Sequence, residues 1–100
     1  MELLHTWQAH ELVVYSLVCD EDRLFSSSSE GEVKEWDPKT CEFRQMTILS
    51  SPVNQKATEV KALAFGVNGL LYGGDDGGNV STLRCALFCK IWRMELHSRP

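Results

Sequence analysis

The chain contains an internal repeat, and this feature limits the possible folds more than any other. Four features of the first half recur 46 residues later: Val14 as Val60, Leu17 as Leu63, Leu24 as Leu70, and Glu30-Gly31 as Asp76-Gly77. One inserted residue then aligns Val33 with Val80 and Trp36 with Leu83. A period in the forties indicates that one supersecondary unit occurs twice in the 100 residues.

Each unit alternates short apolar stretches with turn signals. We expect strands at residues 12–19, 24–28, 32–36 and 41–49, and again at 60–65, 70–72 and 80–83. Glycines mark the turns, and the run GGDDGG at 73–78 is interpreted as a tight hairpin turn. This spacing predicts an all-β fold, and about four short strands per forty-odd residues are typical of a propeller blade.

The first unit also carries an ordered set of short motifs. These are His10, a V-x-x-L strand, an apolar-Ser-x-Ser strand ending at Ser28, the turn glycine Gly31, and the pair Trp36-Asp37. In this order the chain resembles the WD-repeat (WD40) β-propeller family. The resemblance covers residues 3–83, and it is specific in the first repeat and degenerate in the second. It implies a partial β-propeller of about two four-stranded antiparallel blades in an incomplete ring.

The resemblance also implies a buried hydrogen-bonded network across the first blade. Its members would be His10, Ser28, Glu30 and Trp36. The indole N–H needs an acceptor, which a hydroxyl supplies, and the hydroxyl can donate onward to the imidazole and the imidazole to the carboxylate. Glu30 stands where the family has Asp. Glu35 falls between blades, where a carboxylate must be paired or near the rim.

The repeats set the expected organisation of the chain. WD-repeat blades occupy residues 1–83, with the first repeat at 10–49 and the degenerate second at 56–83, and a divergent tail at 84–100. The second repeat has Lys56 and Leu83 at the positions of His10 and Trp36, so its polar network cannot form. We expect apolar contacts alone to hold it.

Catalytic and metal sites are weighed and set aside. His10, Ser28 and Glu30 are the residue types of a hydrolase triad, but the structural network explains them together with Trp36. Cys85, Cys89 and His97 supply only three ligands at an unusual spacing. GGDDGG lacks the Lys-Ser/Thr of a phosphate loop and the distal Glu of a calcium loop. We therefore predict no catalytic residue, no metal and no cofactor.

The resemblance further implies a partner-binding rim. The family positions that face this rim correspond to Tyr15 and Ser29 in the first repeat and to Lys61 and Asp75 in the second. Tyrosine suits the centre of a protein interface. Ser29 is expected to be exposed at its turn, where it is also a candidate for phosphorylation.

Charge and apolar patterning limit the partners. The net charge of -4 argues against nucleic acid and anionic membranes, and the apolar stretches are too short to span a bilayer. The N-terminus does not read as a secretory signal. We expect an intracellular protein, by default cytoplasmic with a nuclear location open, whose cysteines are mostly reduced.

These observations predict a non-catalytic protein–protein interaction scaffold that presents a rim to protein or peptide partners. The alternative is a substrate-recognition or accessory segment of a larger enzyme, such as a ubiquitin ligase, whose catalytic part is absent. Two blades cannot close a ring of four to eight. The chain is then a fragment of a longer propeller, which we favour, or it self-associates to complete a ring, or it stays an unstable open piece.

Overall fold

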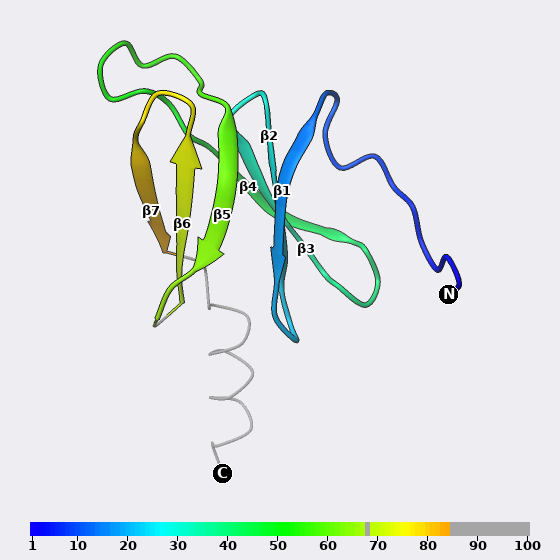
Figure 1. The fold of residues 1–100 in the computed structure, drawn as a ribbon. Coiled ribbons are helices and arrows are strands. Elements are labelled where there is room, and N and C mark those ends of the chain that lie inside the picture. Colours follow the sequence, from blue (N-terminus) through cyan, green and yellow to red (C-terminus); the bar gives the residue numbers. More distant parts are fainter. Residues whose placement is uncertain (68, 85–100) are drawn as a thin grey trace.

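Seven strands form two antiparallel sheets in the part of the chain that the computed structural model describes, residues 1–67 and 69–84. Sheet 1 contains β1 (Val14–Cys19), β2 (Leu24–Ser28), β3 (Glu32–Trp36) and β4 (Phe43–Ile48). Sheet 2 contains β5 (Val60–Phe65), β6 (Leu70–Asp75) and β7 (Val80–Arg84). Within each sheet the spatial order follows the chain order (Figure 1).

The predicted all-β fold is confirmed, and every predicted strand forms within a few residues of its expected bounds. Sheet 1 has the expected four strands, whereas sheet 2 has three within the described residues. β7 runs one residue past the predicted end of the second repeat. Apart from Arg84, the predicted tail at 84–100 lies outside the described residues, and so do Cys85, Cys89 and His97.

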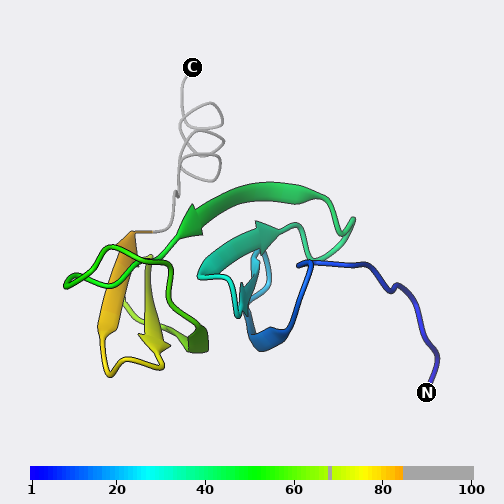
Figure 2. The same cartoon turned by 90° about the horizontal axis from the view of Figure 1, so that it is seen from above.

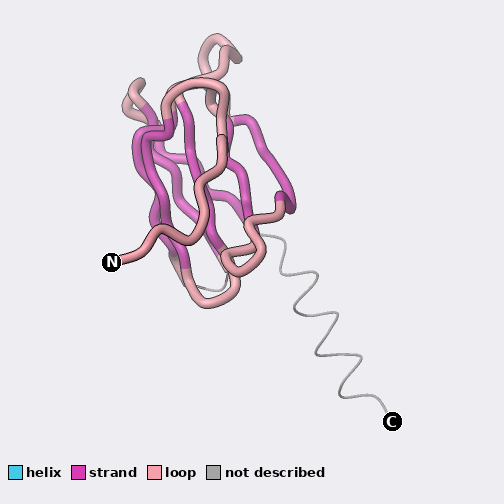
Figure 3. Tube along the Cα trace, turned by 90° about the vertical axis from the view of Figure 1, so that its right-hand side faces the viewer, coloured by secondary structure: helices cyan, strands magenta, loops and turns pink. Residues whose placement is uncertain are grey.

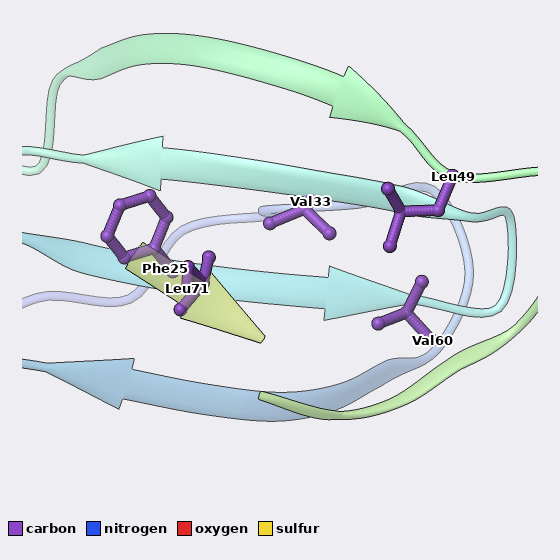
Figure 4. Packing of buried hydrophobic residues seen from close by; sticks show 5 residues of the cluster. All are labelled: Phe25, Val33, Leu49, Val60 and Leu71. Atoms are coloured by element: carbon purple, nitrogen blue, oxygen red, sulfur yellow. The ribbon is translucent and has the colours of Figure 1, made fainter. Parts of the chain in front are cut away.

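The two sheets pack against each other, with β5 beside β1 and β2 (Figure 2). The core between them consists of five buried side chains: Phe25, Val33, Leu49, Val60 and Leu71 (Figure 4). Burying a side chain of this size stabilises a fold by about 1.5–3 kcal/mol. Because both sheets contribute side chains to this core, each sheet needs the other to bury the face that it turns toward it.

Strand register divides each sheet into two faces. Phe25 and Val33 lie on the inner face of sheet 1, toward sheet 2. Leu24, Ser26 and Trp36 lie on its outer face, because successive strand residues alternate. A loop of residues 1–13 crosses this outer face (Figure 3). The Trp7 and Trp36 rings meet edge to face there, and Lys34 Nζ donates to the Ala9 carbonyl at 2.8 Å.

The register also shows that sheet 2 repeats sheet 1, with one correction to the predicted alignment. The first strands match at an offset of 46, since the register shift between Val14 and Ser16 recurs between Val60 and Ala62. In the next two strands the offset is 47, because Leu24 pairs with Trp36 as Leu71 pairs with Leu83. The insertion therefore lies before the second strand, and Leu24 corresponds to Leu71, not Leu70.

The β2–β3 and β6–β7 turns confirm the offset of 47. Gly31 and Gly78 both have a positive φ, at 79° and 83°. The Ser28 hydroxyl accepts the backbone N–H groups of Glu30 and Glu32, and an Asp75 oxygen accepts those of Gly77 and Asn79. Glu30-Gly31 therefore corresponds to Gly77-Gly78 and not to Asp76-Gly77. The predicted matches of Val33 with Val80 and of Trp36 with Leu83 are correct.

Candidate functional site

A buried polar network crosses the outer face of sheet 1, but two of its four members differ from the prediction. Trp36 Nε1 donates to the Ser26 hydroxyl at 3.0 Å, and the same hydroxyl lies 2.7 Å from His10 Nε2. On the other side of the ring, His10 Nδ1 lies 2.9 Å from Glu32 Oε1. With the proton on Nδ1, every polar group in the network has a partner. His10 and Trp36 are thus confirmed as members, together with Ser26 and Glu32.

Ser28 and Glu30 were wrongly predicted as members of this network. Trp36 stands opposite Leu24, so Ser26 is its diagonal neighbour on the same face and Ser28 lies two residues farther along β2. Ser28 instead caps the β2–β3 turn through its hydroxyl. Glu30 lies within that turn, and its Oε1 is buried without a hydrogen-bond partner among the described residues. The structure therefore does not bring His10, Ser28 and Glu30 together.

Glu35 is buried on the inner face of sheet 1 at 4% exposure, and it is paired as predicted. Arg44 Nη1 lies 3.0 Å from one of its carboxylate oxygens, and Gln45 donates to the other. Arg44 also bridges to Asp37 at 3.1 Å. A small pocket between the sheets is lined by Phe25, Val33, Leu71 and Leu83 with Glu35. Because both of its oxygens are engaged, the Glu35 carboxylate is a structural ion pair.

The predicted rim lies at one end of the two sheets. The starts of β1 and β5 and the β2–β3 and β6–β7 turns meet there, and we call it the Tyr15 end (Figure 1). Tyr15 is half-buried where the sheets adjoin, and Lys61 Nζ lies 3.8 Å from the centre of its ring. The Tyr15 hydroxyl donates to Glu59, and Lys61 also lies 3.7 Å from Glu59. The contact joins equivalent positions, because Tyr15 and Lys61 are 46 residues apart.

The charges at the Tyr15 end stabilise one another. The pKa of Glu59 lies below its ordinary value, chiefly because Tyr15 donates to the carboxylate, with further contributions from Asp76 and the Lys61 ammonium. The pKa of Lys61 is raised by its hydrogen bond with Tyr15, followed by the Glu59 charge. At neutral pH the end therefore presents an aromatic ring flanked by a carboxylate and an ammonium group.

The other two predicted rim residues do not join this cluster. The Ser29 hydroxyl is buried without a hydrogen-bond partner among the described residues, and its backbone N–H donates to the Val13 carbonyl. The prediction that Ser29 is exposed and open to phosphorylation is therefore wrong. Asp75 is engaged with its own turn, and the backbone N–H of Asn79 is the main cause of its lowered pKa.

Sequence reasoning missed four residues: Ser26, Glu32, Glu59 and Asp76. Residues at every second position of a strand share a face, so counting back from Trp36 along β3 and across the hairpin into β2 could have identified Glu32 and Ser26 as its neighbours. Glu59 and Asp76 carry no local signal, because the Asp76 N–H reaches the Glu59 carbonyl, at 3.2 Å, only after the β6–β7 turn folds against β5.

The described residues contain no group of three or more His, Cys, Asp or Glu side chains that could hold a metal ion. Cys19 and Cys41 carry free thiols. Over the same part of the chain, no helix has the length and apolar character needed to cross a membrane.

No protein-family model and no curated protein matches this chain. Among solved structures it resembles the crystal structure of the computationally designed Ika4 protein, with a TM-score of 0.61 and 21% sequence identity. The match covers 76% of this chain and 43% of Ika4, so the chain spans less than half the length of that protein. At this identity the likeness concerns the fold alone.

Proposed function

We propose that the chain is a non-catalytic protein–protein interaction module, built from WD-repeat propeller blades, and that its Tyr15 end binds a protein or peptide partner. The observation that carries this proposal is the cluster of Tyr15, Lys61 and Glu59 at the junction of the two sheets. Its aromatic ring is held between two sheets that pack on a shared core, and large, rigid side chains of this kind anchor protein interfaces.

The stacked repeats support the blade assignment. The inner face of sheet 2 is equivalent to the outer face of sheet 1. Leu71 and Leu83 lie on the inner face of sheet 2, and their equivalents Leu24 and Trp36 lie on the outer face of sheet 1. The sheets therefore pack in the same sense, as successive units of an array do. The network of His10, Ser26 and Trp36 agrees with the motif order from which the family resemblance was drawn. The free thiols of Cys19 and Cys41 suit the intracellular compartment that we propose for the protein.

Selection from a displayed random peptide library tests this function. We expect peptides that bind the wild-type chain and lose at least tenfold in affinity to Tyr15→Ala, since about 1.4 kcal/mol corresponds to tenfold and anchor residues contribute more. Lys39→Ala is the matched control, because Lys39 is exposed in the connection at the opposite end of sheet 1. Binding of every selected peptide that is unchanged in Tyr15→Ala would overturn the proposal.

A further inference from the structure

Both outward faces of the stacked sheets lack a covering sheet in the described residues, and both expose apolar side chains. On sheet 2 the outer face carries Ala64, Tyr72 and Val80, and Val80 is 74% exposed. On sheet 1 the outer face carries Leu17, and this side chain is 64% exposed. Exposed apolar side chains that gather on one surface indicate an interaction site.

The repeat shows what each face fits. Val18, Phe25 and Val33 are the inner-face residues of sheet 1, and their equivalents on sheet 2 are Ala64, Tyr72 and Val80, all on its outer face. The inner-face residues of sheet 2 are Leu63, Phe65, Leu71 and Leu83, and their equivalents on sheet 1 are Leu17, Cys19, Leu24 and Trp36, all on its outer face. The two outward faces thus repeat the two halves of the core interface, except that Trp36 is already buried beneath Trp7.

We propose that a second copy of this chain docks head to tail, with the outer face of sheet 2 in one copy against the outer face of sheet 1 in the next. The occupant follows from the interface already present within the chain, which this contact continues with equivalent residues on both sides. Docking in this way also brings Lys61 of one copy toward Tyr15 of the next. Tyr15 and Lys61 are equivalent positions, and they already meet across the interface between the two sheets of one chain. Partner binding at the Tyr15 end is not required for this association.

The segments beside the interface agree with this packing. Leu49, in the connection between the sheets, lies over Gly73 on the inner face of sheet 2, where a Cβ on the glycine would come within 3.2 Å of Leu49 Cδ1. His10, in the segment before β1, covers the equivalent residue Ser26 on the outer face of sheet 1. In each sheet, the segment that precedes the first strand therefore covers the equivalent position, Ser26 or Gly73. The rest of that face remains free to pack against another sheet.

A head-to-tail contact has a diagnostic test, because it uses two different faces. We expect the wild-type chain to self-associate with rising concentration in sedimentation equilibrium. Val80→Glu and Leu17→Glu should each be monomeric, since each loses one face. An equimolar mixture of the two variants should form a dimer and nothing larger, because the intact sheet 2 face of Leu17→Glu meets the intact sheet 1 face of Val80→Glu.

Three outcomes would overturn the proposal: a wild-type chain that stays monomeric at all concentrations, a single variant that still self-associates, or a mixture that remains monomeric. Circular dichroism checks that both variants fold, and the exposure of Leu17 and Val80 favours this.

Cross-linking gives a second readout. The rings of Phe25 and Phe65 meet at 5.8 Å, and their equivalents across the proposed contact are Tyr72 and the partner copy's Cys19. Tyr72→Cys should therefore form covalent oligomers on oxidation, whereas Tyr72→Cys combined with Cys19→Ser should not. Equal cross-linking of the two variants would contradict the docking.

Discussion

Ser26→Ala should destabilise the chain more than the same change at either of the next two serines. All three side chains are fully buried, so the comparison holds burial constant. Ser26 accepts the Trp36 indole N–H and lies within 2.7 Å of His10 Nε2. Its loss leaves two buried polar groups without partners.

The magnitude follows from these partners. A buried group left unsatisfied costs about 1–3 kcal/mol, so Ser26→Ala should lower the free energy of unfolding by about 2–6 kcal/mol. Ser27 donates once, to the Val60 carbonyl at 2.8 Å, and Ser28 accepts two turn N–H groups at 3.1 and 3.3 Å. By the same rule Ser27→Ala removes the partner of one buried group and should cost about 1–3 kcal/mol, whereas loss of a turn cap costs about 1 kcal/mol. A domain of this size is stable by about 5–15 kcal/mol, so Ser26→Ala removes a large part of the total.

Urea unfolding followed by circular dichroism at low temperature measures all three variants against the wild type. Circular dichroism is preferable to fluorescence because the chain has three tryptophans. If Ser28→Ala cost as much as Ser26→Ala, or more, the network as described would be refuted. A slowly exchanging Trp36 indole proton in the wild type, lost in Ser26→Ala, would identify the broken hydrogen bond directly.

Three further predictions concern turns, ion pairs and pH. Gly31→Ala should lower the free energy of unfolding more than Gly78→Ala does in the same urea assay. Both glycines have a left-handed backbone, which costs about 1–2 kcal/mol for a residue with a side chain. A Cβ at Gly31 would in addition lie 2.7 Å from the Leu49 carbonyl oxygen, whereas one at Gly78 meets nothing within 4 Å. Equal losses would contradict this packing. Arg44→Met should cost about 1–3 kcal/mol, less than a fully buried pair because the Arg44 side chain is 36% exposed, whereas Lys39→Met should leave the denaturation midpoint unchanged. The pKa values of Asp37, Glu59 and Asp75 in the folded chain lie below their ordinary values of 3.8, 4.5 and 3.8. These carboxylates therefore stabilise the fold fully when the pH is above the ordinary pKa values. The stabilisation is lost as the pH falls through the lower pKa values of the folded state. The melting temperature should therefore fall on acidification below these ordinary values, and it should fall less steeply in Asp75→Asn; a flat profile would rule this linkage out.

The strands were predictable because their signals are local. Alternating apolar residues and glycine-containing turns bound most of them, and the core residues Phe25, Val33, Val60 and Leu71 all lie in predicted strands. The pairing of Glu35 was also predictable, because an unpaired carboxylate at a buried strand position is too costly. The strand inferences required no knowledge of how the two sheets pack, whereas the one about Glu35 used its expected position between blades.

Register was harder, because the sequence offers several equivalent residues at the deciding positions. Leu70 and Leu71 are adjacent, so either matches Leu24 by residue type, and only strand pairing selects Leu71. The run Ser26–Ser29 poses the same problem, since a shift of one residue moves a side chain to the opposite face. The residue type alone could not show that Ser26 belongs to the polar network and that Ser28 caps the turn. The pairing of β2 with β3 around Trp36 and the positive φ of Gly31 distinguish the two serines.

The equivalent positions Ser26 and Gly73 show how one strand framework is stabilised in two ways. In sheet 1 the space over Ser26 is filled by an imidazole, and the serine hydroxyl satisfies both His10 and Trp36. In sheet 2 the space over Gly73 is filled by Leu49, and the position of Trp36 is taken by Leu83, which packs on the core. Apolar packing at Gly73 needs no polar partner, but it requires a sheet on the other side to complete the burial. Sheet 1 supplies that face within the chain. On the outer face of sheet 2, Val80 is exposed whereas its equivalent Val33 is buried between the sheets, and this difference is the physical reason to expect a further sheet there.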